Sequence, residues 1–172
     1  MTTTSPLAAA LTAACGYRTG LSPALPDGRT AASIGVEIFG NETLLPNIEQ
    51  PLHAATSESA RRFLDLELLS PRRADLVLTG SIKDFQRREG ARTPDNLFVE
   101  TLDVLLIEAS LVDRARGVTL GSTRVETVVG SAIDVPGREP VQRERGLKVA
   151  ADQIVLSLLA DLEYRASAPP QD

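Results

Sequence analysis

The chain has 172 residues, with 23 acidic and 18 basic side chains, a formal net charge of −5 and 42% hydrophobic residues. This length fits one domain, which can bury about two-thirds of its unfolded surface and needs no disulfide or metal to fold. The mild acidity argues against a general nucleic-acid binder, which carries a strong basic excess. After Cys15, no segment approaches the roughly 18 apolar residues that span a bilayer.

The N-terminal segment contains an apolar run that ends at Cys15, the only cysteine. A run of small apolar residues (7–14) before a lone cysteine is typical of a bacterial lipoprotein signal, whose cysteine is lipidated and becomes the mature N-terminus. We therefore expect residues 1–14 to be a signal peptide and Cys15 to be the lipid anchor. Residues 1–6 carry no charged side chain and Thr12 replaces the usual leucine, so we expect a basic segment upstream of Met1.

The tether and the first two elements follow. Residues 15–30 carry the lipidated cysteine and a Pro- and Gly-rich stretch without periodicity, which predicts a tether. Residues 33–39 alternate apolar and polar side chains, as in a half-buried strand. Residues 49–69 space their apolar side chains as in a helix, with Pro51 in the first turn, where its missing N–H is not needed.

Three strands are expected next. Residues 75–85 form the first, and a charged loop over 86–96 follows. Residues 97–113 are apolar on both faces at their centre, which indicates a central strand with a bulge that swaps faces. A tight turn over 113–117 leads to 118–129, whose weaker alternation places it nearer the sheet edge.

The last element is a helix over 146–164, preceded by a loop over 130–146. The order strand, helix, strand, strand, strand, helix predicts an α+β fold. We expect a two-layer α/β sandwich with a mixed four-stranded sheet and both helices on one face. The first two strands should be parallel with a right-handed crossover, and the last three an antiparallel meander. The expected boundaries are 31–165 for the single domain and 166–172 for a disordered tail.

An ordered series of short motifs runs along these predicted elements. It begins with Cys15-Gly16-Tyr17, continues with the strand and its Asn41 and Thr43, and includes Asp75, Gly80 and Gly117. The series resembles the LPS-assembly lipoprotein family, LptE, in the form seen outside the enteric bacteria, over nearly the whole mature chain.

The resemblance implies a non-enzymatic outer-membrane lipoprotein. Members of that family sit in the lumen of a large β-barrel, LptD, where they act as a plug, help the barrel to assemble and assist delivery of lipopolysaccharide to the outer leaflet. For this chain it implies attachment to the outer membrane by a lipid, facing the periplasm or inside the barrel lumen. Gly16 lacks the aspartate that retains lipoproteins at the inner membrane, which is compatible with this sorting.

The sequence holds little catalytic machinery. His53 is the sole histidine, and we expect it to be solvated or partly packed rather than a catalytic base. A zinc site needs three or four nitrogen or sulfur ligands, and only His53 and Cys15 exist. No phosphate-binding glycine motif occurs. We expect no enzyme activity, no cofactor and no metal.

Basic residues gather at the end of the second strand and in the loop after it: Lys83, Arg87, Arg88 and Arg92. Arginine binds phosphate in a bidentate geometry, and lipid A carries phosphates, so these residues are candidates for contact with lipopolysaccharide. A solvated hairpin tip is the alternative. The pairs Arg72/Arg73 and Arg114/Arg116 lie in other turns and are expected to be merely exposed.

Two further expectations concern partners. The sheet face away from the helices should be mostly polar, with aromatic spots at Phe39 and Phe85, and should meet a polar barrel lumen or solvent. The alternative function is an envelope lipoprotein that activates a peptidoglycan synthase. Such activators have long tethers, whereas residues 16–30 reach about 50 Å at most, which favours a role close to the membrane.

Overall fold

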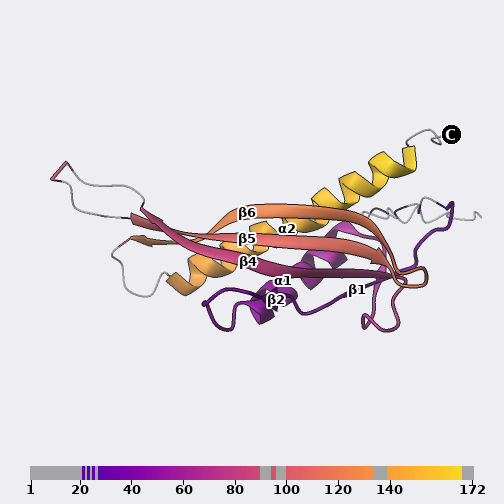
Figure 1. The fold of residues 1–172 in the computed structure, drawn as a ribbon, viewed down its shortest axis with the longest axis horizontal. Coiled ribbons are helices and arrows are strands. Elements are labelled where there is room, and N and C mark those ends of the chain that lie inside the picture. Colours follow the sequence, from indigo (N-terminus) through magenta and orange to yellow (C-terminus); the bar gives the residue numbers. More distant parts are fainter. Residues whose placement is uncertain are drawn as a thin grey trace, which may run out of the picture.

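The computed structural model describes residues 21, 23, 25, 27–89, 94–95, 100–133 and 139–167. Its elements are, in chain order, β1 (Ser33–Val36), β2 (Gly40–Asn41), α1 (Glu49–Phe63), β3 (Glu67–Leu68), β4 (Leu76–Glu89), β5 (Glu100–Asp113), β6 (Val118–Ile133) and α2 (Glu139–Ser167). Figure 1 shows a long sheet with both helices packed behind it. The expected α+β fold, with a mixed sheet covered by two helices, is confirmed.

The sheet has the strand order β3-β1-β4-β5-β6, and β2 pairs with β4. β1 and β4 are parallel, with Ile34 opposite Leu76, and α1 lies in the crossover between them. β4, β5 and β6 form the expected antiparallel meander. Within the described residues β6 ends the order, so the edge position expected for it is confirmed.

The sheet contains two short strands that the sequence did not predict, so the expected number of four was too low. β3 falls inside the helix expected over 49–69. α1 ends at Phe63, because Leu64 adopts an extended backbone (φ −107°, ψ 136°). Glu67 and Leu68 then pair in parallel with β1 and occupy its outer edge. Burial of Leu64 and Leu68 near the core mimicked a continued helical stripe, while backbone pairing decided the local structure.

The bulges lie in the neighbours of β5 rather than in β5 itself. Lys83 is the extra residue of β4, between the pairs Ile82–Ile107 and Asp84–Leu106. Beyond it, Phe85 lies opposite the buried Leu105 and packs against the core on the helix side. The expectation that Phe85 lies on the uncovered face was therefore wrong, because a bulge shifts the alternation by one residue.

Phe39 also belongs to the core and not to the uncovered face. It is 2% exposed, and a Cβ added to Gly80 would lie 2.7 Å from its ring. Gly80 shares a strand face with the buried Leu78 and Ile82. Phe39 therefore fills the space that a side chain at position 80 would need.

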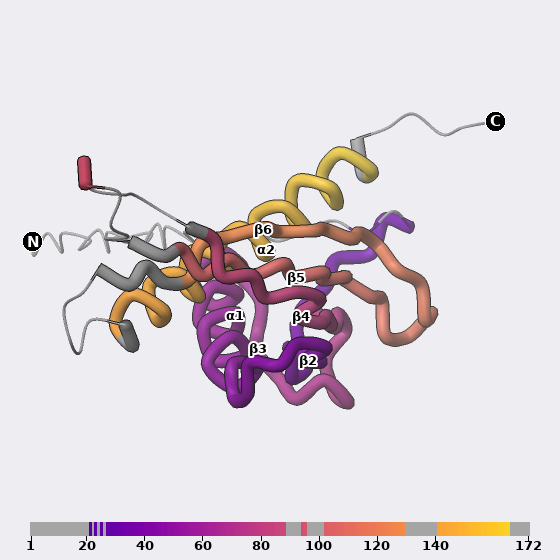
Figure 2. The backbone as a smooth tube through the Cα atoms, turned by 60° about the vertical axis from the view of Figure 1, so that its left-hand side comes forward, coloured from indigo at the N-terminus to yellow at the C-terminus, as the bar shows by residue number. Residues whose placement is uncertain are grey.

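The helices bury the stripes that their spacing predicted. In α1 these include Leu52, Ala55 and Ala60, and in α2 they run from Leu147 to Leu162. α2 begins at Glu139, not at 146, because Pro140 fits a first helical turn. β6 likewise continues to Ile133, so most of the loop expected over 130–146 is strand or helix. The last turns of α2, yellow in Figures 1 and 2, project beyond the sheet.

Part of the expected tether packs on the domain. Leu21 pairs with Leu64 as an isolated bridge, and its N–H donates to the Phe63 carbonyl at 2.9 Å. Leu25 is buried. The chain is therefore in contact with the domain at Leu21 and at Leu25, and Cys15 lies outside the described residues.

Candidate functional site

The uncovered face of the sheet is the first candidate surface. Side chains on this face alternate with the buried ones along β4, β5 and β6. Ser110 and Ser122 share a hydrogen bond of 2.9 Å across it. A small apolar spot interrupts the polar surface where Val104 and Leu106 lie beside Val128, which is 48% exposed. The expectation of a mostly polar face therefore holds for these strands, with aliphatic rather than aromatic spots.

Lys83 is the first of the predicted lipopolysaccharide contacts. The β4 bulge presents its ammonium to Glu42, with Nζ 2.5 Å from Oε1, and 4.0 Å from Glu108. The hydrogen bond from Lys83 holds the pKa of Glu42 below its ordinary value, and the same bond raises the pKa of Lys83. Lys83 is thus a paired cation.

Arg87 and Arg88 are adjacent on β4, so their side chains leave opposite faces of the sheet. Arg87 donates to Asp103 from Nε at 2.9 Å and from Nη2 at 3.3 Å, on the helix side. Arg88 donates to Glu126 at 2.8 Å on the uncovered face. The sequence cluster is therefore split between faces, and acidic neighbours compensate its described charges. Arg92, the fourth predicted contact, lies outside the described residues.

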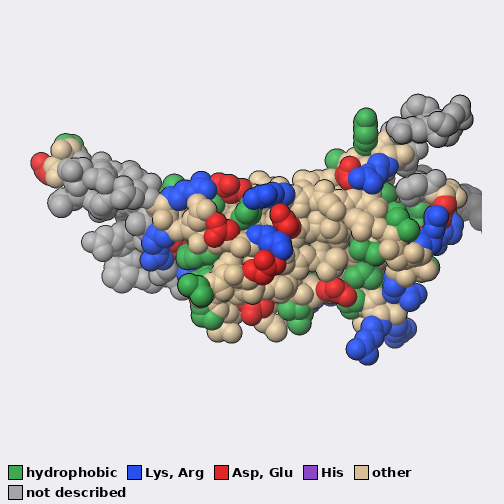
Figure 3. Space-filling model, viewed as in Figure 1, with side chains coloured by type: hydrophobic (Ala, Val, Ile, Leu, Met, Phe, Trp, Pro, Cys, Tyr) green, Lys and Arg blue, Asp and Glu red, His purple; other side chains and the backbone are tan. Residues whose placement is uncertain are grey.

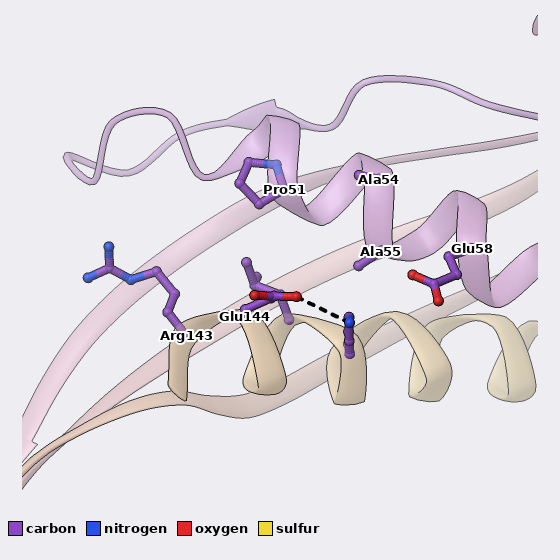
Figure 4. Close-up of a pocket in the computed structure, with 8 residues that line it drawn as sticks. Pro51, Ala54, Ala55, Glu58, Arg143 and Glu144 are labelled. Carbon is purple, nitrogen blue, oxygen red and sulfur yellow. Dashed lines mark ion pairs between the residues drawn. The ribbon is translucent and has the colours of Figure 1, made fainter. Parts of the chain in front are cut away.

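A groove between the helices is a feature that the sequence did not predict. α1 and α2 run parallel, and Asp152 ties them together by accepting from Ser59 Oγ at 2.5 Å and pairing with Arg62. Towards their N-terminal ends they enclose an open cavity of about 470 Å³. Figure 4 shows the lining: Pro51, Ala54, Ala55, Glu58, Arg143, Glu144, Leu147 and Lys148.

This groove offers packing and ion pairing rather than chemistry. Its floor is built from short apolar side chains, and Glu144 pairs with Lys148 at 3.2 Å on its rim. Within the part of the chain that the structure describes, no histidine or hydroxyl side chain lines it. Only the parallel placement of two helices far apart in the chain creates it, so no local sequence signal could have found it.

His53, the one catalytic candidate weighed from the sequence, contacts a backbone carbonyl. His53 Nδ1 lies 3.2 Å from the Glu37 carbonyl oxygen, an arrangement that suits a packed histidine. Among the described residues, no three His, Cys, Asp or Glu side chains cluster closely enough to hold a metal ion. Within the same ranges, no helix is long and apolar enough to cross a bilayer.

The motif residues instead hold loops. Asp75 Oδ2 accepts from Ala32 N at 3.0 Å, Ser33 N at 3.1 Å and Ser33 Oγ at 2.9 Å, where the chain enters β1. These bonds, led by that from Ala32, lower the pKa of Asp75. Asp75 thus has a structural role as an acceptor of backbone N–H groups at the entry to β1.

Asn41 and Thr43 build the turn before α1. The Asn41 side-chain oxygen Oδ1 accepts from Thr43 N at 3.0 Å and Thr43 Oγ1 at 2.8 Å, and its side-chain Nδ2 donates to the Leu45 carbonyl at 2.8 Å. The amide also reaches Glu49 in the first turn of α1 at 3.2 Å. The motif therefore fixes how the chain leaves the sheet and enters the helix.

The comparisons with known proteins identify the fold. No family model matches the chain, and no curated protein does. Solved structures share the architecture. Lipoprotein B from Nitrosomonas europaea is 14% identical, with 78% of this chain and 88% of that chain covered and a TM-score of 0.52. A DUF330 protein from Xanthomonas campestris is 9% identical, with 79% and 88% covered, also at 0.52.

A hypothetical protein from Chlamydia trachomatis is 12% identical, with 80% of this chain and 99% of that chain covered and a TM-score of 0.52. At these identities the likeness concerns the fold alone. The class defined by the structure is thus a small α+β domain with two helices on a mixed sheet, a fold that a bacterial lipoprotein also uses.

Proposed function

We propose that this chain is a non-enzymatic outer-membrane lipoprotein, anchored through Cys15, that plugs and helps assemble an LptD-type β-barrel and assists delivery of lipopolysaccharide. The observation that carries the proposal is the ordered LptE-like series from Cys15 to Gly117, whose described members belong to a fold shared with lipoprotein B of Nitrosomonas europaea. Its Asn41, Thr43 and Asp75 make the contacts that hold this fold together.

The dimensions of the sheet support a plug. β4 has 14 residues and β6 has 16, so the ribbon extends about 45–50 Å at roughly 3.3 Å per residue. The apolar band of an outer-membrane barrel is about 25 Å tall, and its lumen is polar. The long ribbon that Figure 1 displays, with its mostly polar uncovered face, suits such a lumen.

The ion pairs of the basic residues on β4 affect which of them could contact lipopolysaccharide. Lys83 and Arg88 would exchange Glu42 and Glu126 for lipid A phosphates, whereas Arg87 has a mostly buried carboxylate partner and would stay with it. We therefore propose Lys83 and Arg88 as stronger candidates for phosphate contact than Arg87, and Arg92, outside the described residues, stays a candidate from the sequence. Exchange of one anion for another costs little at an exposed pair, because such pairs contribute about 0–1 kcal/mol.

The test is capture of partners by the tagged chain extracted from membranes, followed by mass spectrometry. A large β-barrel protein recovered in stoichiometric amount supports the proposal. The matched control is Cys15→Ser, which should remain outside the membrane fraction and lose most of the barrel. Recovery of a peptidoglycan synthase without a barrel would replace the proposal with the synthase-activator function.

A further inference from the structure

The end of the molecule where the N-terminal segment joins the domain brings together three arginine-bearing segments. They are residues 27–29, the loop 70–75 before β4, and the turn 113–117 between β5 and β6. The arginines in them are Arg29, Arg72, Arg73, Arg114 and Arg116. We call this group the anchor-end arginines. In Figure 3, Lys and Arg side chains gather at the right-hand end, where β5 turns into β6 in Figure 1.

Hydrogen bonds hold the three segments together. Arg114 donates from Nε to the Ala74 carbonyl at 2.6 Å and from its backbone N–H to the Asp75 carbonyl at 3.0 Å, which ties the β5–β6 turn to the loop before β4. Arg116 pairs with Asp27 at 3.0 Å, and Arg29 pairs with Asp113. Residues that the sequence scatters over three turns thus form one surface.

The loop before β4 packs closely against β1, which fixes its place in this surface. A Cβ added to Gly35 would lie 2.6 Å from Pro71 Cα, so the absence of a side chain lets the loop rest directly on β1. The Arg73 N–H donates to the Ser70 carbonyl at 2.9 Å and closes the loop. The positions of Arg72 and Arg73 are therefore set by the backbone of the domain.

The surface carries a positive excess. Its three segments hold five arginines against Asp27, Asp75 and Asp113, which leaves two positive charges. Arg72 and Arg73 are exposed, and among the described residues neither side chain forms an ion pair. This separates them from Lys83, Arg87 and Arg88, whose charges are compensated.

The length of chain outside the structure brings this surface to the membrane. Six residue steps separate Leu21, which is bonded to the domain, from Cys15, a span of at most about 20 Å. If Cys15 carries the lipid, Leu21 lies within about 20 Å of the bilayer, so the end with the anchor-end arginines can approach the headgroups. The partner that fits two free guanidinium groups at this distance is a layer of lipid phosphates.

We propose that the anchor-end arginines, through Arg72 and Arg73, contact the anionic headgroups of the membrane that holds the lipid anchor. This rests on the lipid anchor of the proposed function but not on its barrel partner. The contact adds an electrostatic signal to the acyl chains and sets which end of the domain meets the headgroups.

The test uses the full chain with Cys15→Ser, so that binding cannot come from acyl chains. The measurement is co-sedimentation with vesicles of phosphatidylcholine alone and of phosphatidylcholine with phosphatidylglycerol. We expect binding only to the anionic vesicles, and weaker binding at 1 M salt, where the screening length falls to about 3 Å. The variant R72Q/R73Q should bind roughly 30-fold more weakly, from about 1 kcal/mol per basic residue at an anionic surface.

The matched control is R124Q/R145Q, which removes the same charge from exposed positions outside the three segments. It should change binding by no more than about twofold, because charges beyond a screening length contribute little. Equal losses in both variants, or equal binding to both kinds of vesicle, would overturn the proposal. An unacylated Cys15 in protein extracted from cells would overturn the orientation. Failure of barrel capture leaves all of these outcomes untouched.

Discussion

Gly146 allows a sharp test of the packing, because two physical effects oppose each other there. It lies inside α2, where replacing glycine with alanine normally stabilises a helix by about 1 kcal/mol. In this structure, however, a Cβ at position 146 would lie 2.3 Å from Val129 Cα and 2.6 Å from the Val128 carbonyl oxygen. Both neighbours are backbone atoms of β6 and cannot rotate away.

The magnitude follows from the displacement required. Ordinary contact begins at 3.4 Å, so α2 would have to move about 1.1 Å away from β6 at this point. Overpacking of a well-packed core costs about 1–3 kcal/mol, and rigid neighbours place this site at the upper end. After the gain in helix propensity, we expect Gly146→Ala to lower the free energy of unfolding by about 2 kcal/mol.

Urea unfolding followed by circular dichroism measures this difference. Thermal unfolding should show a loss of roughly 4–8 °C, since 1 kcal/mol corresponds to about 2–4 °C for a chain of this size. The control is Ser157→Ala on the exposed side of α2, where propensity acts alone and stability should rise by a few tenths of a kcal/mol. A Gly146→Ala protein at least as stable as the wild type would refute the close contact between α2 and β6.

Two other substitutions, with a third as a control, test the polar contacts. Asp75→Ala should cost about 1.5 kcal/mol at neutral pH, because it removes hydrogen bonds from Ala32 and its neighbour to a charged group. Since these bonds hold the folded-state pKa of Asp75 below 3.8, its contribution is complete above about pH 4 and is lost as the pH falls through the folded-state value. Unfolding from pH 7 to pH 2 should therefore show the wild type and variant converging, and a constant difference would contradict this. Arg87→Ala should cost about 2 kcal/mol, because it leaves the buried Asp103 without this partner. Arg124→Ala, which breaks an exposed pair at 3.8 Å, should cost less than 0.5 kcal/mol on the scale of about 0–1 kcal/mol for such pairs, and equal costs would refute the assignment.

The larger elements could be predicted because their signals are local. Apolar side chains at helical spacing in α2, or at alternate positions in β4, record which side of the element is buried. The parallel and antiparallel pairings then follow from connection lengths, since a helix joins β1 to β4 and a short turn joins β5 to β6.

The errors share one physical origin, which is pairing between segments far apart in the chain. β3 replaces the end of an expected helix only because β1 offers an unpaired edge. The bulge at Lys83 moves Phe85 from one face to the other, and a single strand carries no local mark of such a register shift.

For the candidate site, too, the residues could be identified from the sequence, but their contacts between remote segments could not. The sequence identified the basic residues 83, 87 and 88, but their acidic partners Glu42, Asp103 and Glu126 lie on other strands or loops and could not be assigned. Conversely, arginines that looked like isolated exposed turns form one surface, because backbone contacts join the loops that bear them.

Local sequence patterns were enough to predict the burial of each long element and to recognise the motif series that begins at Cys15, because these depend on side chains close together in the chain. The fold was needed to show which charges are compensated, where the groove between α1 and α2 opens, and which loops share the anchor end. These features depend on distances between remote segments. Such distances are set by strand register and by how closely backbones approach at Gly35, Gly80 and Gly146.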